Sequence, residues 1–128
     1  MRREPSPTRR SRGLAARAAG RRTEWIAALW LMAKGYRVLG FRLKTPFGEV
    51  DLLVQRGAVL AVVEVKRRRT LEEALCAVGA VQRERLLRAG ANLAARVRTP
   101  QALVVRLDLI ALAPRRWPRH IRAAWGQD

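Results

Sequence analysis

Gly48–Lys66 reads GEVDLLVQRGAVLAVVEVK, and this stretch predicts two apolar strands joined by a tight turn. Gly57 is followed by Ala58 between the two apolar runs, and Gly at the first central position favours a two-residue type II′ turn. Such a turn pairs Arg56 with Val59 and produces an antiparallel hairpin. A shift of the turn by one residue would break this register, so the register is itself a hypothesis.

Acidic side chains occur inside both strands of this hairpin, where burial makes an unpaired charge costly. Because side chains alternate along a strand, Glu49 and Asp51 share one face, and so do Glu64 and Lys66. The predicted register places Asp51 opposite Glu64 and Glu49 opposite Lys66. Two carboxylates at that spacing repel each other, raise each other's pKa and favour a cation between them.

The charge of the chain points to a polyanionic partner. The 128 residues carry a formal net charge of +17, from 27 Lys and Arg against 10 Asp and Glu. That length suits one core, so we expect a disordered basic tail at residues 1–13 and a single domain at residues 14–128. Like charges on a folded chain repel one another, and a polyanion relieves this repulsion. We therefore expect nucleic acid, DNA first, ahead of an anionic membrane surface.

The composition also bears on location. No apolar run is long enough to span a bilayer, and the N-terminal stretch lacks the apolar segment of a secretory signal. The single cysteine, Cys76, cannot form an intrachain disulfide, which fits a reducing cytoplasm. We expect a cytoplasmic protein without a membrane partner. Its oligomeric state is open; a homodimer would supply the two sites that a two-strand cut needs.

The spacing of apolar residues predicts the other elements. They are a helix from Leu14 or Thr23 to Lys34, a strand at Tyr36–Lys44, a helix from about Leu71 to Arg98 with a break near Gly79, and a strand at Gln101–Ala113. The first helix is expected to bury a stripe of apolar residues, which are Trp25, Ala28, Leu29 and Met32, widened by Ile26, Trp30 and Ala33. Thr70 and Glu73 have the spacing of a capping box. The order α-β-β-β-α-β predicts an α/β fold, a small mixed sheet flanked by helices, whose last strand runs parallel to its predecessor.

The acids of the hairpin predict a divalent-metal site. Mg²⁺ takes oxygen ligands, usually one or two carboxylates together with waters and substrate phosphate oxygens. Asp51 and Glu64 would be the carboxylate ligands, with the backbone carbonyl of Val65. The metal would polarise a phosphodiester and activate a water, while Lys66 orients that water or neutralises charge on the phosphate. The residues leave a second interpretation open, in which strand ion pairs join Glu49 to Lys66 and the other acids to arginines.

Asp51 followed by Glu64-Val65-Lys66 resembles the split D…(D/E)xK motif of the restriction-endonuclease-like nucleases. The chain resembles more closely the YraN-like family of small bacterial proteins, over about Gly20 to Trp125. The matching residues are Gly20-x-x-x-Glu24 with Ala27; Gly35-Tyr36; Gly48-Glu49-Val50-Asp51; Val63-Glu64-Val65-Lys66 followed by Arg68; Arg106-Leu107-Asp108; and His120 with Ala124-Trp125.

This resemblance implies a restriction-endonuclease-like αβββαβ core, dependence on Mg²⁺ or Mn²⁺, and phosphodiester cleavage. By position it implies that Asp51, Glu64 and Lys66 are the catalytic core and that Glu24 is a helix-borne acid brought toward the metal. The role of Glu49 stays open. The expected function is that of a metal-dependent nuclease acting on DNA or structured nucleic acid. The alternative is a non-catalytic nucleic-acid-binding protein that retains the nuclease fold.

Further residues are expected to hold the nucleic-acid backbone, which positions the polymer without reading its sequence. They are Arg67, Arg68, Arg69, Arg106 and Gln82. The family often carries a Lys near Gln82. Arg106 and Asp108 alternate in a strand and are expected to form an ion pair. His120, the single histidine, has no evident partner in the sequence, so we expect it to be solvated or at an interface. Trp117 and Trp125 are expected to anchor the C-terminal tail to the core.

Overall fold

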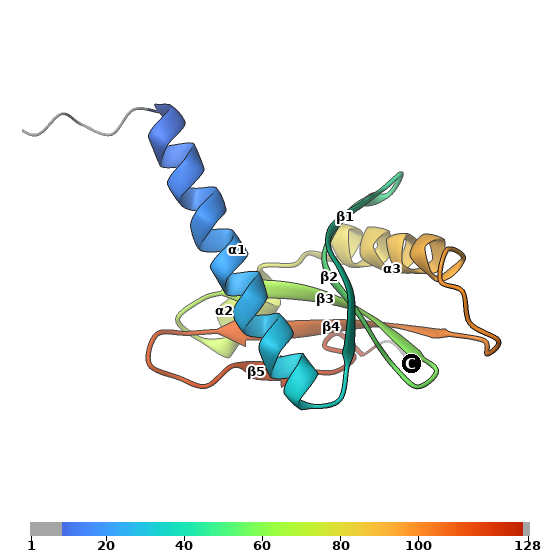
Figure 1. Ribbon diagram of the computed structural model, residues 1–128. Helices are drawn as coiled ribbons and strands as arrows, with labels where there is room; N and C mark the ends of the chain where they lie inside the picture. Colours follow the sequence, from blue (N-terminus) through green and yellow to red (C-terminus); the bar gives the residue numbers. More distant parts are fainter. Residues whose placement is uncertain (1–8, 127–128) are drawn as a thin grey trace, which may run out of the picture.

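The computed structural model describes residues 9–126, with side chains from Arg21 onward. A five-stranded sheet in the order β1-β2-β3-β4-β5 forms its centre (Figure 1). The elements are α1 (Arg9–Ala33), β1 (Arg37–Thr45), β2 (Gly48–Arg56), β3 (Val59–Arg67), α2 (Leu71–Cys76), α3 (Ala80–Ala94), β4 (Val104–Leu112) and β5 (Arg119–Ile121).

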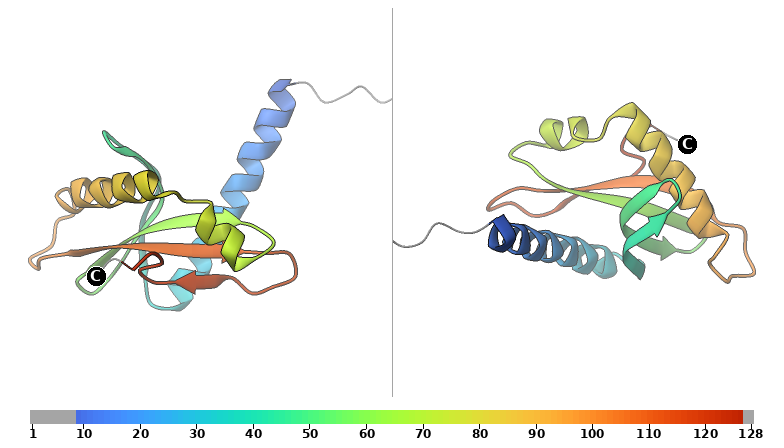
Figure 2. Two further views of the ribbon diagram at one scale, coloured as in Figure 1. Left: turned by 180° about the vertical axis from the view of Figure 1, so that it is seen from behind. Right: turned by 90° about the horizontal axis from the view of Figure 1, so that it is seen from above.

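Helices cover both faces of this sheet, with α1 on one face and α2 and α3 on the other (Figure 2). The core is accordingly divided. Leu31 of α1 packs with Leu52 and Ile110, whereas Leu86 of α3 packs with Leu53 and residues of the opposite sheet face. β1, β2 and β3 form an antiparallel meander, and β4 runs parallel to β3. The predicted mixed α/β architecture and the parallel last crossover are therefore confirmed.

The hairpin between β2 and β3 has the predicted register. Gly57 adopts a φ of +57°, as the first central residue of a type II′ turn requires, and Arg56 pairs with Val59. The pairing continues to Leu52 and Val63 and goes no further. Beyond Leu52 and Val63, β2 still pairs with β1 and β3 still pairs with β4, but β2 and β3 no longer pair with each other. We call the opening between these two separating strands the fork. The predicted pairings of Asp51 with Glu64 and of Glu49 with Lys66 consequently lie beyond the end of the ladder.

The crossover helix is broken where expected. The side-chain oxygen of Thr70 accepts a hydrogen bond from the backbone N–H of Glu73 at 3.1 Å, which caps α2, and Gly79 is the N-cap residue that precedes α3. Gly90 of α3 lies so close to the sheet that a Cβ atom there would approach Val62 and Val105 to 2.7 and 2.6 Å. A glycine at this position lets α3 pack directly on the strands.

Helix α1 begins at Arg9, within the range expected for the tail, and residues 1–8 of that tail lie outside the described residues. The stripe predicted for its buried face is wrong at its three large residues, although Ala28 of that stripe is buried. Trp25, Leu29 and Met32 are 55%, 59% and 51% exposed, and the face that meets the sheet carries Ala27 and Leu31. The helix is apolar on several sides, so spacing alone does not select the face; the small alanine side chain lets the helix approach the sheet closely. No helix among residues 9–126 combines the length and apolarity needed to cross a membrane.

The strand β5 is absent from the prediction. Its three residues, Arg119–Ile121, pair with β4 at Ala111, Ile110 and Leu109. A strand this short carries almost no alternation signal, and the pairing depends on a partner ten residues away in the chain. Its consequence is that His120 lies at the edge of the sheet beside residues of β4.

Candidate functional site

The fork between β2 and β3 brings the predicted metal ligands together. Asp51 is the first residue of β2 beyond the ladder, and its Oδ2 atom accepts a hydrogen bond from the backbone N–H of Val65 at 3.1 Å. A carboxylate thus replaces the backbone partner that the separating strand no longer supplies. The N–H and C=O groups of one residue in a strand point toward the same neighbour, so the carbonyl of Val65 also faces the fork.

Glu64 lies beside Asp51 and is almost completely buried, with 3% of its surface exposed. Burial raises the pKa of Glu64 to about 8, and the negative charge of Asp51 adds to the rise, while the charge of Lys66 opposes it. The Oε1 atom of Glu64 has no hydrogen-bond partner within the described part of the chain. A buried carboxylate oxygen without a partner, next to a second carboxylate, is a donor set that fits Mg²⁺ or Mn²⁺.

Lys66 completes this group. Its Nζ atom is 4.0 Å from Oε2 of Glu64, and its side chain is 23% exposed. At this distance the ammonium group is held near the carboxylates without being locked by a short hydrogen bond. Its donors therefore remain available for a water molecule or a phosphate oxygen at the mouth of the fork.

Glu24 is brought to the same region but has its own partner. Both of its carboxylate oxygens accept hydrogen bonds from Nε of Arg42, at 3.0 and 2.9 Å. The hydrogen bond with Glu24 raises the pKa of Arg42, and the charges of Glu49 and Asp51 contribute to the same rise. Arg42 thus lies among the acids, in a left-handed conformation with φ of +50°. Sequence reasoning missed Arg42, because nothing local distinguishes it from the other arginines.

The site therefore offers fewer acids than a fully acidic metal centre. Among the described residues, no group of three His, Cys, Asp or Glu side chains is placed to hold a metal ion. Asp51 and Glu64 remain as the carboxylate pair, and Glu49 is exposed on the outer part of β2. Two carboxylates with one backbone carbonyl suit a cation that keeps several waters and takes phosphate oxygens from a substrate.

Arginines surround the C-terminal end of β3. Arg67, Arg68 and Arg69 follow Lys66 directly and are all exposed. A cavity of about 210 Å³ lies there; besides Arg68 and Arg69, its lining includes Arg116, Trp117 and Arg119. Trp117 is 80% exposed and its ring lies 5.8 Å from that of Trp30. The arrangement places positive charge and an exposed aromatic ring beyond the C-terminal end of β3.

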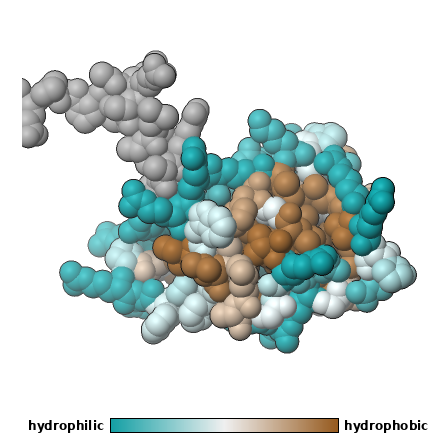
Figure 3. Space-filling view, in the orientation of Figure 1, coloured by the Kyte–Doolittle hydropathy of each residue, from teal (hydrophilic) through white to brown (hydrophobic). Residues whose placement is uncertain are grey.

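A groove of about 670 Å³ adjoins the fork on the α3 side of the sheet. It is lined by Glu49 of β2, by Gln82 and Arg85 of α3, and by the apolar Phe47 and Val81. Figure 3 shows apolar side chains gathered over β1 and the neighbouring part of α3. Gln82 is exposed in this groove, as a contact to a bound chain would require.

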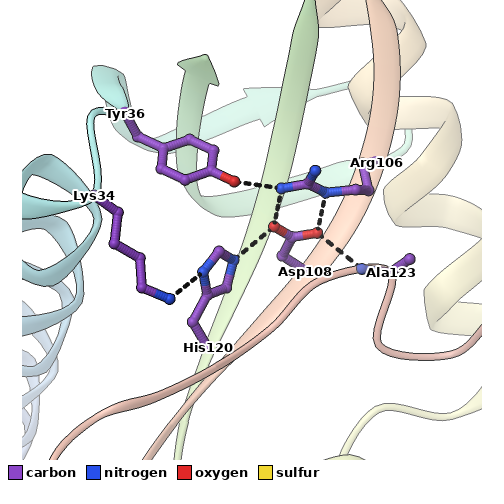
Figure 4. A network of polar contacts seen from close by, with 6 residues as sticks. All are labelled: Lys34, Tyr36, Arg106, Asp108, His120 and Ala123. Atoms are coloured by element: carbon purple, nitrogen blue, oxygen red, sulfur yellow. Dashed lines mark hydrogen bonds and ion pairs between the residues drawn. The ribbon is translucent and has the colours of Figure 1, made fainter.

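A second polar cluster lies on the α1 face of the sheet (Figure 4). Asp108 is fully buried, and its carboxylate accepts two hydrogen bonds from Arg106, at 2.7 and 2.8 Å. The hydroxyl of Tyr36 accepts a third hydrogen bond from Arg106 at 2.6 Å. The predicted ion pair of Arg106 and Asp108 is confirmed. The Nε and Nη2 atoms of Arg106 donate to Asp108 and Tyr36 inside the fold. This weakens the expectation that Arg106 binds a nucleic-acid backbone.

His120 belongs to this cluster, so the expectation of a solvated histidine without a partner is wrong. Its side chain is 1% exposed, and Nε2 lies 2.7 Å from Oδ2 of Asp108. Its Nδ1 atom lies 3.1 Å from Nζ of Lys34, at the end of α1. The partners are 12 and 86 residues away in the sequence, which is why no local pattern indicated them.

The electrostatics of the cluster keep Asp108 ionised. Burial by itself would raise its pKa, but hydrogen bonds from His120, Arg106 and the amide of Ala123 outweigh burial and hold the pKa below the ordinary value. Trp125 follows in the chain; its Nε1 donates to the carbonyl of Leu75 at 3.1 Å, so its predicted role as an anchor is confirmed. Trp117 is exposed, and its ring packs against the ring of Trp30.

Replacing Glu64 with Gln is expected to remove a pH dependence of stability. The folded-state pKa of about 8 lies above the ordinary 4.5, so the folded state binds the extra proton between these values and the free energy of unfolding falls as pH rises through them. Gln does not titrate, so the stability of Glu64→Gln relative to wild type rises with pH up to about pH 8, by on the order of 5 kcal/mol in total. Urea denaturation across this range in a metal chelator measures the difference, and parallel profiles would contradict the raised pKa.

The fold and this site define a class: small, strongly basic α/β proteins with a carboxylate pair and a lysine at the fork of a hairpin. The chain belongs to the uncharacterised protein family UPF0102, whose match covers residues 23–112 and includes all three of these side chains. The predicted membership in the YraN-like family is thereby confirmed.

Relatives in this family cover nearly the whole chain. A UPF0102 protein of Caulobacter vibrioides (strain NA1000 / CB15N) is 68% identical over 118 residues, which are 92% of this chain and 94% of the relative. One from Caulobacter sp. (strain K31) is 62% identical over 125 residues, 98% of this chain and 90% of the relative. One from Maricaulis maris (strain MCS10) is 47% identical over 110 residues, 86% and 87% of the two chains.

Proposed function

We propose that this protein is a cytoplasmic, metal-dependent nuclease with a restriction-endonuclease-like core that hydrolyses phosphodiester bonds in DNA or structured nucleic acid. The observation that carries this proposal is the meeting of Asp51 and Glu64 at the fork, with Lys66 beside them. Two adjacent carboxylates and a partly buried ammonium group are the groups that metal-assisted hydrolysis of a phosphodiester needs. They occur in a chain whose net charge is +17.

In this mechanism each group has a separate task. Asp51, Glu64 and the carbonyl of Val65 would hold Mg²⁺ or Mn²⁺, which when bound polarises the scissile phosphate and makes a water molecule more acidic. The fixed hydrogen bond between Asp51 and the N–H of Val65 holds this carboxylate in place before substrate arrives. Lys66 orients the attacking water or stabilises the negative charge that develops on the phosphate. Glu24 acts indirectly, because it positions Arg42 near Asp51.

The surfaces around the fork support a nucleic-acid substrate. Arg67, Arg68 and Arg69 provide contacts to phosphates at the end of β3, and Gln82 lines the groove on the other side. Such contacts position the polymer and carry little sequence information.

A cleavage screen with purified protein tests the proposal. Labelled duplex, flap, junction and single-stranded substrates are incubated with Mg²⁺, with Mn²⁺, and with a chelator. We expect cleavage of at least one substrate that the chelator abolishes. Cleavage that is indifferent to the chelator would contradict a metal-dependent reaction, and absence of cleavage on every substrate would favour the alternative below.

The alternative is a non-catalytic nucleic-acid-binding protein, and the Glu24–Arg42 pair is the observation that favours it. An arginine bound to Glu24 among the remaining acids supplies positive charge that a metal would otherwise bring. Calorimetric titration with Mn²⁺ separates the two functions. Binding of one ion per chain supports the nuclease, while absence of binding in a protein that still binds DNA supports the alternative.

Replacing Lys66 with Ala is expected to reduce cleavage by about 10²- to 10³-fold, because removal of one group that stabilises transition-state charge typically costs this much. Affinity for DNA should change by less than about threefold, since Lys66 is one cation among many at the surface. Single-turnover cleavage and a binding titration on the same substrate measure the two effects. Equal losses in both would mean that Lys66 only contacts a phosphate.

The affinity for DNA is expected to fall steeply with salt. A protein that makes 6–10 phosphate contacts loses about 10³- to 10⁵-fold in affinity between 50 and 200 mM salt, because bound counterions are released. With the arginines clustered here, we expect a loss of at least about 10²-fold over that range. Fluorescence anisotropy with a labelled duplex measures it. A flat response to salt would argue against nucleic acid as the partner.

A further inference from the structure

A basic cavity of about 390 Å³ lies on the α1 face, away from the carboxylate fork. It is lined by Lys34, Tyr36, Arg56, His120 and Arg122. These residues come from the end of α1, the end of β2 and the region of β5, so three separate elements build it. The cavity is thus a product of the tertiary fold and has no counterpart in a local sequence motif.

The cations around this cavity have no acidic ion-pair partner among the side chains that the structure describes. Among residues 21–126, no carboxylate forms an ion pair with Lys34, Arg56 or Arg122. The guanidinium of Arg56 lies over the ring of Tyr36, 5.7 Å from its centroid. Three positive charges held around one cavity repel each other, and an anion in the cavity relieves that repulsion.

The cavity is lined by three residues of the cluster in Figure 4, which are Lys34, Tyr36 and His120. Asp108 already accepts hydrogen bonds from Arg106 and His120, so its negative charge is used within the fold. The Nε2 atom of His120 therefore carries the proton that Asp108 accepts, and Nδ1 is turned to the ammonium of Lys34 at 3.1 Å. The buried pair of His120 and Asp108 thus holds the ammonium group of Lys34 at a defined position. An ordinary surface lysine has no such partner.

We propose that this cavity binds a phosphate monoester group. A dianion matches three unpaired cations better than a single charge does, and Arg56 and Arg122 can each donate two hydrogen bonds to a phosphate. A concave site also suits a terminal group better than the continuous backbone of a strand, which lies along open grooves. The proposal stands independently of the nuclease reaction.

The cavity is separate from the carboxylate fork. Asp108 is aligned with Val63 in the parallel pairing of β4 and β3, and Glu64 is the next residue, so its side chain points to the opposite face of the sheet. Arg56 is five residues from Asp51 along β2, a distance of about 16 Å. Variants in the cavity therefore test a second site without touching the proposed metal ligands.

Calorimetry with wild type and two double variants tests the proposal, using inorganic phosphate and a nucleoside monophosphate as probes at 150 mM NaCl. Lys34→Gln with Arg122→Gln removes two cations of the cavity. Arg88→Gln with Arg96→Gln removes the same charge from exposed positions on and after α3. We expect the cavity variant to lose at least about tenfold in affinity for the nucleoside monophosphate and the control variant less than about twofold.

A pair of ten-nucleotide strands, one with a 5′-phosphate and one with a 5′-hydroxyl, distinguishes the sources of the monoester. If strand ends are bound, the phosphorylated strand binds more tightly and the cavity variant removes that advantage. If free nucleotides are bound, the variant weakens only the mononucleotide. Both results support the site. Equal losses in the two double variants, or no phosphate-dependent binding of any probe by wild type, would overturn it.

Discussion

Replacing Asp51 with Asn is expected to lower metal-dependent cleavage by at least about 10³-fold, because a metal ligand supplies several kcal/mol of transition-state stabilisation. The fold should survive the change. The amide oxygen of Asn can still accept the hydrogen bond from Val65 N–H that now measures 3.1 Å, so the fork keeps its shape while one negative charge is lost. Mn²⁺ binding measured by calorimetry should disappear together with cleavage.

The same variant has a readout that does not depend on catalysis. The charge of Asp51 is the second cause of the raised pKa of Glu64, so Asp51→Asn should move that pKa toward its ordinary value. Carbon-detected NMR of the glutamate carboxyl groups follows this titration. Glu72→Gln, at an exposed position of α2, removes the same charge and serves as the control. Cleavage by Asp51→Asn at the level of this control would exclude Asp51 as a metal ligand.

Replacing Asp108 with Ala is expected to reduce the free energy of unfolding by about 3–5 kcal/mol, the cost of removing one partner from a buried ion pair. Asp108 is fully buried and accepts hydrogen bonds from Arg106, His120 and the amide of Ala123. Its removal leaves these donors in a dry environment without an acceptor. Urea denaturation at neutral pH measures the loss.

An exposed ion pair provides the matched control for this variant. Glu84 and Arg88 are 2.9 Å apart on α3 with more than half of each side chain in solvent, so Glu84→Ala should cost less than about 1 kcal/mol. Because the pKa of Asp108 is lowered, its stabilisation is present above the unfolded pKa and is lost as the pH falls through the folded one. The difference between wild type and Asp108→Ala should therefore shrink in strong acid. A similar cost for both variants would mean that the buried network contributes little.

Features that depend on neighbours in the chain could be predicted from the sequence. Turn chemistry at Gly57 and strict alternation in the flanking strands set the hairpin register, and the register determines which acids meet. The capping residue Thr70 and the break at Gly79 are equally local. Strand alternation has a period of two, so a correct turn decides the face of the side chains that follow within the ladder.

Features that depend on distant contacts could not be predicted in this way. Arg42 binds Glu24 across 18 residues, and Lys34 reaches His120 across 86. Helix α1 carries apolar residues on several sides. Only its packing against the sheet decides that Ala27 is buried while Trp25 is exposed. Neither the partner of a charged side chain nor the buried face of an all-round apolar helix is encoded in a periodic pattern.

The sequence by itself determined the antiparallel meander of β1, β2 and β3, the parallel crossover to β4, and the meeting of Asp51 with Glu64, because hairpin geometry converts local spacing directly into side-chain position. Only the tertiary structure decided that Glu24 is bound to Arg42 and that His120 is buried against Asp108. Those outcomes follow from which elements pack together, since burial makes an ion pair form with whichever charge the fold brings within reach.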